Sequence, residues 1–182
     1  MWKFLTLLFQ LFLSPVNGWN DVSYADVNPK DLATKGFYPL LLITSLTVFL
    51  QGLYHVGLSF VSLLQLCIIM FVKFFLSFFI SNFIFSMYGF RYSERGDSEK
   101  HNQTFILFSL SLLALSSLIQ NLIPMDLDVV YFLSIYVAII MWRGVKYMAI
   151  YPDKRGSFMI FSILTIIVPP YLIGFLFEKI VQ

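Results

Sequence analysis

Residues 60–87 read FVSLLQLCIIMFVKFFLSFFISNFIFSM, an apolar stretch broken by one charged side chain, Lys73. A helix needs about 20 predominantly apolar residues to cross the hydrocarbon core of a bilayer. Four other stretches have the same character, so we expect five membrane-spanning helices, over residues 37–57, 60–87, 104–123, 129–150 and 158–177. The sequence therefore predicts an all-α, polytopic membrane helix bundle.

The composition supports a membrane environment. Of the 182 residues, 59% are hydrophobic and 12% are charged, whereas a soluble domain carries about 25% charged residues. So few polar side chains cannot cover a water-facing surface, and the lipid bilayer is the expected surrounding. The net charge of +2 gives no electrostatic footprint for nucleic acid.

The basic residues predict how the chain is oriented. Lys and Arg side chains accumulate on the cytoplasmic side of membrane proteins. With five spans, ten of them fall on one side and only Lys179 falls on the other. We therefore expect an integral membrane protein with a cytoplasmic N-terminus and an outward C-terminus. The ten residues are Lys3, Lys30, Lys35, Arg91, Arg95, Lys100, Arg143, Lys146, Lys154 and Arg155.

The first 36 residues form a separate N-terminal segment ahead of the transmembrane domain, residues 37–182. Residues 1–14 could be a signal peptide, but its cleavage would place the later basic loops outside. Helical spacing gives one narrow polar stripe there, so we expect an amphipathic helix in the inner membrane interface that Pro15 and Gly18 end. Residues 20–36 are predicted to be a polar cytosolic connector, with Trp19 at headgroup depth. The stripe consists of Lys3, Thr6, Gln10 and Ser14.

A candidate intramembrane polar site lies around Lys73. A charge near the bilayer centre costs about 2.5–3.5 kcal/mol, so it marks a functional candidate with a partner. No Asp or Glu falls within the predicted spans, and polar side chains must therefore serve. Alternatively, these side chains are hydrogen-bonding contacts between helices, or the lysine stem reaches toward the interface. The other candidate positions are Gln51, His55, Gln65 and Ser77.

Enzyme signatures are missing from the sequence. It has no GxSxG, no HExxH and no glycine-rich phosphate loop. The two histidines, His55 and His101, fall on opposite sides of the predicted membrane, and Cys67 is the single cysteine. We therefore expect no catalytic residues, no cofactor and no metal site. Pro169-Pro170 predicts a kink in the fifth span.

The order of these parts resembles bacterial members of the Yip (Ypt/Rab-interacting protein) family. In that family a Pro and a following Trp, in an x-P-x-x-x-W-x-x-I/V stretch, precede the first span, and a Pro opens it. Pro15, Trp19, Val22 and Pro39 occupy those positions here. The Asp-Leu-Tyr-Gly-Pro stretch of eukaryotic members is absent, so Rab binding is not carried over, and the resemblance implies a five-span fold in a bacterial inner membrane.

Two function classes follow from these observations. The first is a non-enzymatic scaffold or membrane-organising protein, whose partner is another protein or a second copy of the chain. The second is a small transporter or channel-like permease that uses the polar faces of the first three spans around Lys73. A membrane-bound enzyme is a third and weaker alternative, because the sequence carries no catalytic constellation.

Overall fold

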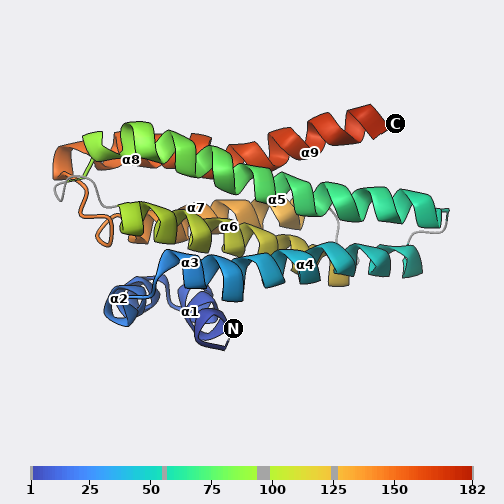
Figure 1. The fold of residues 1–182 in the computed structure, drawn as a ribbon, viewed down its shortest axis with the longest axis horizontal. Helices are drawn as coiled ribbons and strands as arrows, with labels where there is room; N and C mark the ends of the chain where they lie inside the picture. Colours follow the sequence, from blue (N-terminus) through green and yellow to red (C-terminus); the bar gives the residue numbers. More distant parts are fainter. Residues whose placement is uncertain (1, 55–56, 94–98, 124–126, 182) are drawn as a thin grey trace.

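The computed structural model describes residues 2–54, 57–93, 99–123 and 127–181, and this part of the chain is almost entirely helical (Figure 1). The long helices lie side by side, and successive ones run in opposite directions. The helices are α1 (Trp2–Leu13), α2 (Pro15–Ala25), α3 (Pro29–Leu32), α4 (Tyr38–Leu46), α5 (Phe60–Tyr88), α6 (Glu99–Leu122), α7 (Leu127–Arg143), α8 (Arg155–Ser162) and α9 (Val168–Val181).

Four continuous helical segments are long and apolar enough to cross a membrane. The prediction of membrane-spanning helices is therefore confirmed for the first, second, third and fifth predicted spans. Each segment extends at one end or both beyond the predicted limits, because helix formation continues into the polar residues that flank the apolar stretches, whereas the first and third end slightly earlier than predicted. The segments are Pro29–Leu53, Phe60–Arg91, Glu99–Leu122 and Pro152–Ile180.

The predicted span 129–150 is wrong in its extent, because α7 ends at Arg143 and is followed by turns. Its 17 residues make a helix of about 25 Å at 1.5 Å per residue, short of a hydrocarbon core of about 30 Å. The helix ends where Gly144 stands against the ring of Trp19, and Ala149 then adopts a left-handed conformation with φ 49°. Five membrane crossings are thus not established by helix length.

Helix α6 forms the centre of the bundle. Its side chains from Thr104 to Ser116 are buried on every face of the helix. A helix that is apolar all round is typical of such a central position. Helices α4, α5 and α7 pack around it, and α1 adds Phe4, which stacks on Phe108 with the ring centroids 5.6 Å apart.

The predicted connector 20–36 is largely helical, because α2 continues to Ala25 and helical structure resumes at Pro29. Both Pro15 and Pro29 occupy the first positions of their helices, where the missing N–H would have no partner in any case. Asn28 caps the second of these helices by accepting a hydrogen bond from the Lys30 backbone N–H at 3.0 Å. The prolines begin helices here, whereas the sequence analysis took Pro15 as a stop.

Helices α1 and α2 form a hairpin that lies across the long helices, and both are seen end-on in Figure 1. A methyl group at Gly18 would stand 2.6 Å from Leu11 Cα, so this glycine permits the close crossing of the two helices and does not end α1. The helix predicted over residues 1–14 is confirmed. Its apolar face packs on protein through Phe4, Leu7, Leu8 and Leu11.

Trp19 attaches this hairpin to the bundle. Its side chain is only 2% exposed, so the ring packs on protein, while its depth in the membrane stays a prediction. The indole N–H donates to the Ile140 carbonyl in the last turn of α7 at 2.8 Å, and this carbonyl also accepts from the Gly144 N–H at 3.2 Å. The ring stacks on Phe105 and Tyr147 at 5.3 and 5.2 Å.

The two consecutive prolines lie where the last helical segment is irregular. A π-helical turn, Ile163–Ile167, joins α8 to α9 just before Pro169-Pro170. Neither proline has an N–H to offer the Thr165 carbonyl. The Ser81 hydroxyl of α5 donates to that carbonyl instead, at 2.6 Å, and so ties α5 to the irregular turn.

We expect Trp19→Phe to lower the free energy of unfolding by about 1 kcal/mol, because the ring stays but the indole hydrogen bond is lost. Trp19→Ala should cost about 3–5 kcal/mol, the usual loss for a buried aromatic side chain. Equilibrium unfolding in detergent micelles measures both. Trp2→Ala is the matched control, since Trp2 is 83% exposed. Equal stabilities for Trp19→Ala and Trp2→Ala would contradict the anchoring role.

Candidate functional site

Lys73 lies in the middle of α5 and faces α9. A Cβ added at Gly174 would stand 3.5 Å from Lys73 Cδ, so this glycine leaves space for the lysine stem. The ammonium nitrogen is 5.2 Å from the centroid of the Phe74 ring, within the range of a cation–π contact. The side chain is therefore enclosed between two helices and does not extend alone into lipid.

Glu178 is an acidic residue on α9 that the sequence analysis did not connect with Lys73. The fifth span was expected to end at residue 177, but α9 continues to Val181. Glu178 follows Gly174 by four residues, so both lie on one helical face, and its negative charge acts on the Lys73 ammonium. Among the described residues the two side chains do not form an ion pair.

The structure does not gather the other predicted polar residues around the Lys73 ammonium. Ser77 is buried, and its hydroxyl donates to the Lys73 backbone carbonyl at 2.6 Å. Gln51 donates instead to Asn121 Oδ1 on α6 at 2.8 Å. Gln65 is partly buried on α5, and His55 lies outside the described residues.

Asn121 is a second polar residue that the sequence analysis missed. Only 2% of it is exposed, and besides accepting from Gln51 its amide donates to the Thr44 carbonyl and the Thr47 hydroxyl at 3.2 and 3.1 Å. These bonds fall where α4 changes into the 3-10 turn Thr47–Leu53. The cluster therefore completes backbone hydrogen bonding at a helix end, and its groups are not directed at an open space.

The basic residues gather at one end of the bundle, called here the basic end, where α5 and α7 finish and α6 and α8 begin. Two contacts tie its segments together: Lys154 donates to the Arg91 carbonyl at 2.9 Å, and Tyr151 N–H donates to the Tyr92 carbonyl at 3.0 Å. The basic loops that the sequence assigned to one side of the membrane are thus neighbours in space.

A cavity of about 160 Å³ opens at the basic end between α2, α7 and α8. Three cationic side chains line it, and its described lining includes no carboxylate. Among the described residues none of the three forms an ion pair. The lining residues are Val16, Trp142, Arg143, Val145, Lys146 and Arg155. This basic pocket joins the N-terminal hairpin to the ends of two bundle helices.

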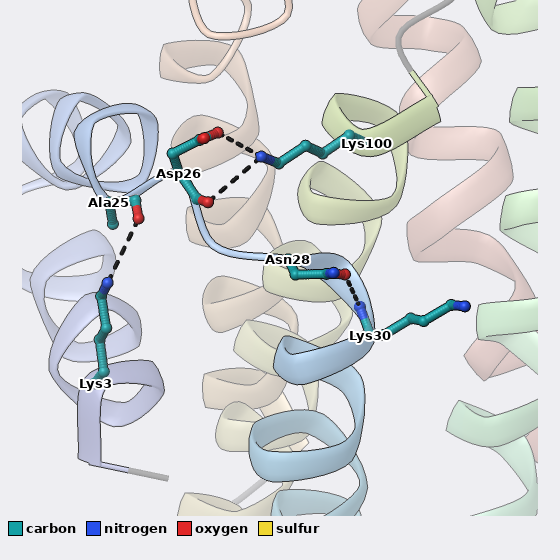
Figure 2. A network of polar contacts seen from close by, with 6 residues as sticks. All are labelled: Lys3, Ala25, Asp26, Asn28, Lys30 and Lys100. Atoms are coloured by element: carbon teal, nitrogen blue, oxygen red, sulfur yellow. Dashed lines mark hydrogen bonds and ion pairs between the residues drawn. The ribbon is translucent and has the colours of Figure 1, made fainter.

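A network of exposed polar contacts holds the hairpin at the same end (Figure 2). Asp26 ends α2 in the left-handed conformation, with φ 43°, and its carboxylate pairs with the Lys100 ammonium of α6. The hydrogen bond from Lys100 and its charge, with a smaller contribution from His101, hold the pKa of Asp26 below its usual value. Lys3 of α1 donates to the Ala25 carbonyl at 3.4 Å.

These features are those of a helical membrane protein whose interior is packed with its own side chains. The described residues contain no group of three or more His, Cys, Asp or Glu that could hold a metal ion. No family model matches the chain, and no curated protein and no solved structure is similar to it. The resemblance to the bacterial Yip family therefore stays a prediction.

The Asp26–Lys100 pair predicts a pH dependence for docking of the hairpin. Because the folded-state pKa of Asp26 is lowered, its contribution to stability is present above the usual carboxyl pKa of about 3.9 and is lost as the pH falls through the lowered value. We expect Asp26→Asn to be less stable than wild type near neutral pH and equally stable in strong acid. Thermal unfolding in detergent at a series of pH values measures the gap.

Asp26→Ala provides the control for backbone strain. Asn tolerates positive φ, whereas Ala does not, so Asp26→Ala should be the less stable of the two variants at every pH. A gap between wild type and Asp26→Asn that stayed constant from neutral to acidic pH would contradict the ion-pair explanation.

Proposed function

We propose that this chain is a non-enzymatic integral membrane scaffold of the Yip type, resident in a bacterial inner membrane. The observation that carries the proposal is the use of the polar side chains inside the bundle. Gln51, Asn121 and Ser81 are bonded to other helices of the same chain. Such an interior supports a fixed arrangement of helices and does not provide a polar path for a solute.

Helix α2 offers a physical reason for the spacing of the Yip-like motif. Pro15 is at the start of this helix, and Trp19 and Val22 are both buried. Their spacing of four and three residues places them on one helical face. In this proposal the motif holds the N-terminal hairpin against the bundle, and the opposite face of α2, with Tyr24 88% exposed, is presented to a cytoplasmic protein partner or a second copy.

The proposal includes five crossings, with the basic end in the cytoplasm. α7 is the shortest of the five passes, and a shorter span is accommodated by local thinning of the bilayer at modest cost. The basic end carries most of the cationic side chains, which the positive-inside rule assigns to the cytoplasmic face. An odd number of crossings then exports the C-terminus.

A reporter fusion tests this orientation. We expect alkaline phosphatase fused behind Gln182 to be active, and green fluorescent protein fused there to be dark, because the first folds only outside the cytoplasm and the second only inside it. A fusion placed after Ser93, at the basic end, should behave in the opposite way. Active phosphatase at Ser93 together with fluorescence at Gln182 would overturn the proposed orientation.

The second candidate function, a small transporter, has one observation in its favour. Lys73 lies within α5, the charge of Glu178 on α9 acts on it, and charged residues within spans are typical of ion and substrate pathways. Gly174 is buried beside the Lys73 stem. In a transporter this site must be reached by water, whereas a scaffold needs no such access.

Cysteine labelling separates the two candidates. We expect Gly174→Cys, in a background where Cys67 is replaced by Ala, to resist a hydrophilic, membrane-impermeant thiol reagent, because Gly174 is buried and its one near neighbour is the Lys73 stem. Lys30→Cys is the control, since Lys30 is exposed at the basic end and should react in open membranes. Equal reaction at both positions would support the transporter and contradict the scaffold.

A further inference from the structure

The basic pocket concentrates positive charge. Lys100 pairs with Asp26, and Lys35 pairs with Asp31 at 2.7 Å. Arg143, Lys146 and Arg155 line one cavity whose described lining includes no carboxylate, and none of the three forms an ion pair with a described residue. Like charges held together repel one another, and an anion placed among them removes that repulsion.

The surface that leads to the pocket is apolar and outward-facing. Phe132, Ile135, Ile139 and Trp142 follow one another on α7 at intervals of three, four and three residues, which keeps them on one face. All four are exposed, by 71, 59, 50 and 48%. This stripe, called here the α7 stripe, runs along the bundle and ends at the pocket, where Trp142 lines both.

The size of the cavity limits what it can hold. Pockets that enclose a whole drug-sized ligand measure about 300–1,000 Å³, and this cavity has about 160 Å³. It has room for a compact anionic group and not for acyl chains. A molecule with a phosphate at one end and a hydrocarbon body at the other fits the pocket together with the α7 stripe.

We propose that the basic pocket binds the phosphate of an anionic phospholipid in the leaflet at the basic end, with the acyl chains along the α7 stripe. Arg143 and Arg155 present planar guanidinium groups, which match phosphate oxygens in a two-pronged geometry, and Lys146 adds a point charge. Basic pockets between membrane helices on the cytoplasmic side are typical sites for anionic headgroups. Val16 brings the N-terminal hairpin into contact with the bound lipid.

The test uses the full chain purified in neutral detergent and titrated with phosphatidylglycerol, phosphatidylcholine or inorganic phosphate. Binding is followed by the shift in thermal unfolding and by an affinity titration. The pocket variant is Arg143→Gln/Lys146→Gln/Arg155→Gln. The matched control is Lys30→Gln/Lys35→Gln/Lys154→Gln, which removes the same charge from exposed positions outside the pocket.

We expect phosphatidylglycerol to stabilise the wild type and phosphatidylcholine and inorganic phosphate to leave it unchanged. Each cation near a membrane surface is worth about fivefold in affinity, so the pocket variant should bind phosphatidylglycerol roughly 100-fold more weakly. The control should lose less than about fivefold. Arg155→Gln alone, at the exposed start of α8, should lose about fivefold, and it keeps the test available if the triple variant does not fold.

Equal losses in the pocket variant and the control would overturn the pocket, because binding would then follow net charge alone. Stabilisation by inorganic phosphate as strong as that by phosphatidylglycerol would overturn the lipid as the source of the phosphate. The inference rests on the membrane location in the proposed function and not on the scaffold role. Labelling of Gly174→Cys would end the scaffold proposal without changing the lipid titration.

Discussion

Backbone carbonyls without a helical N–H partner constrain this bundle more than any other feature. In the hydrocarbon region no water is present to satisfy them, and each one left bare costs several kcal/mol. Helix ends and prolines create such carbonyls at several places within the described residues, and three of them receive a donor from a distant element. The pairs are Tyr136 with Phe12, Ser81 with Thr165, and Asn121 with Thr44. Trp19 adds a second donor to the Ile140 carbonyl at the end of α7, which also accepts from the Gly144 N–H. Each pair links two helices and fixes their relative depth.

The need to satisfy backbone carbonyls distinguishes polar side chains that have a structural role from those that are available for function. Gln51 and Ser77 attract notice as polar residues in apolar helices, yet their hydrogen bonds end on Asn121 and on the Lys73 carbonyl. Two places hold charges whose role the backbone does not explain. One is Lys73 in α5, on which the charge of Glu178 in α9 acts, and the other is the cationic lining of the basic pocket. Functional proposals therefore concentrate on these two places.

Hydropathy predicted the apolar helices because lipid exposure requires a continuous apolar run, but it could not place the helix ends. Pro29 begins a helix and Glu178 continues one, and both lie beyond the hydrophobic stretches. Lys73 was found from the sequence as a lone charge, whereas Glu178 is its neighbour only through the packing of α5 on α9. The role of Trp19 could not be predicted from the sequence either, because the Ile140 carbonyl to which it donates is 121 residues away.

The N-terminal hairpin docks on the same helix ends that line the basic pocket. Docking of the hairpin is therefore linked to ligand binding in the pocket. Trp19 caps the last turn of α7, and that turn also carries Trp142 and Arg143, which line the pocket. Val16, one turn before Trp19 on α2, forms another wall. A ligand that binds only when these walls are together stabilises the docked hairpin by its own binding free energy. An anion in the pocket therefore favours the same arrangement that the indole hydrogen bond holds, and release of the hairpin would open both.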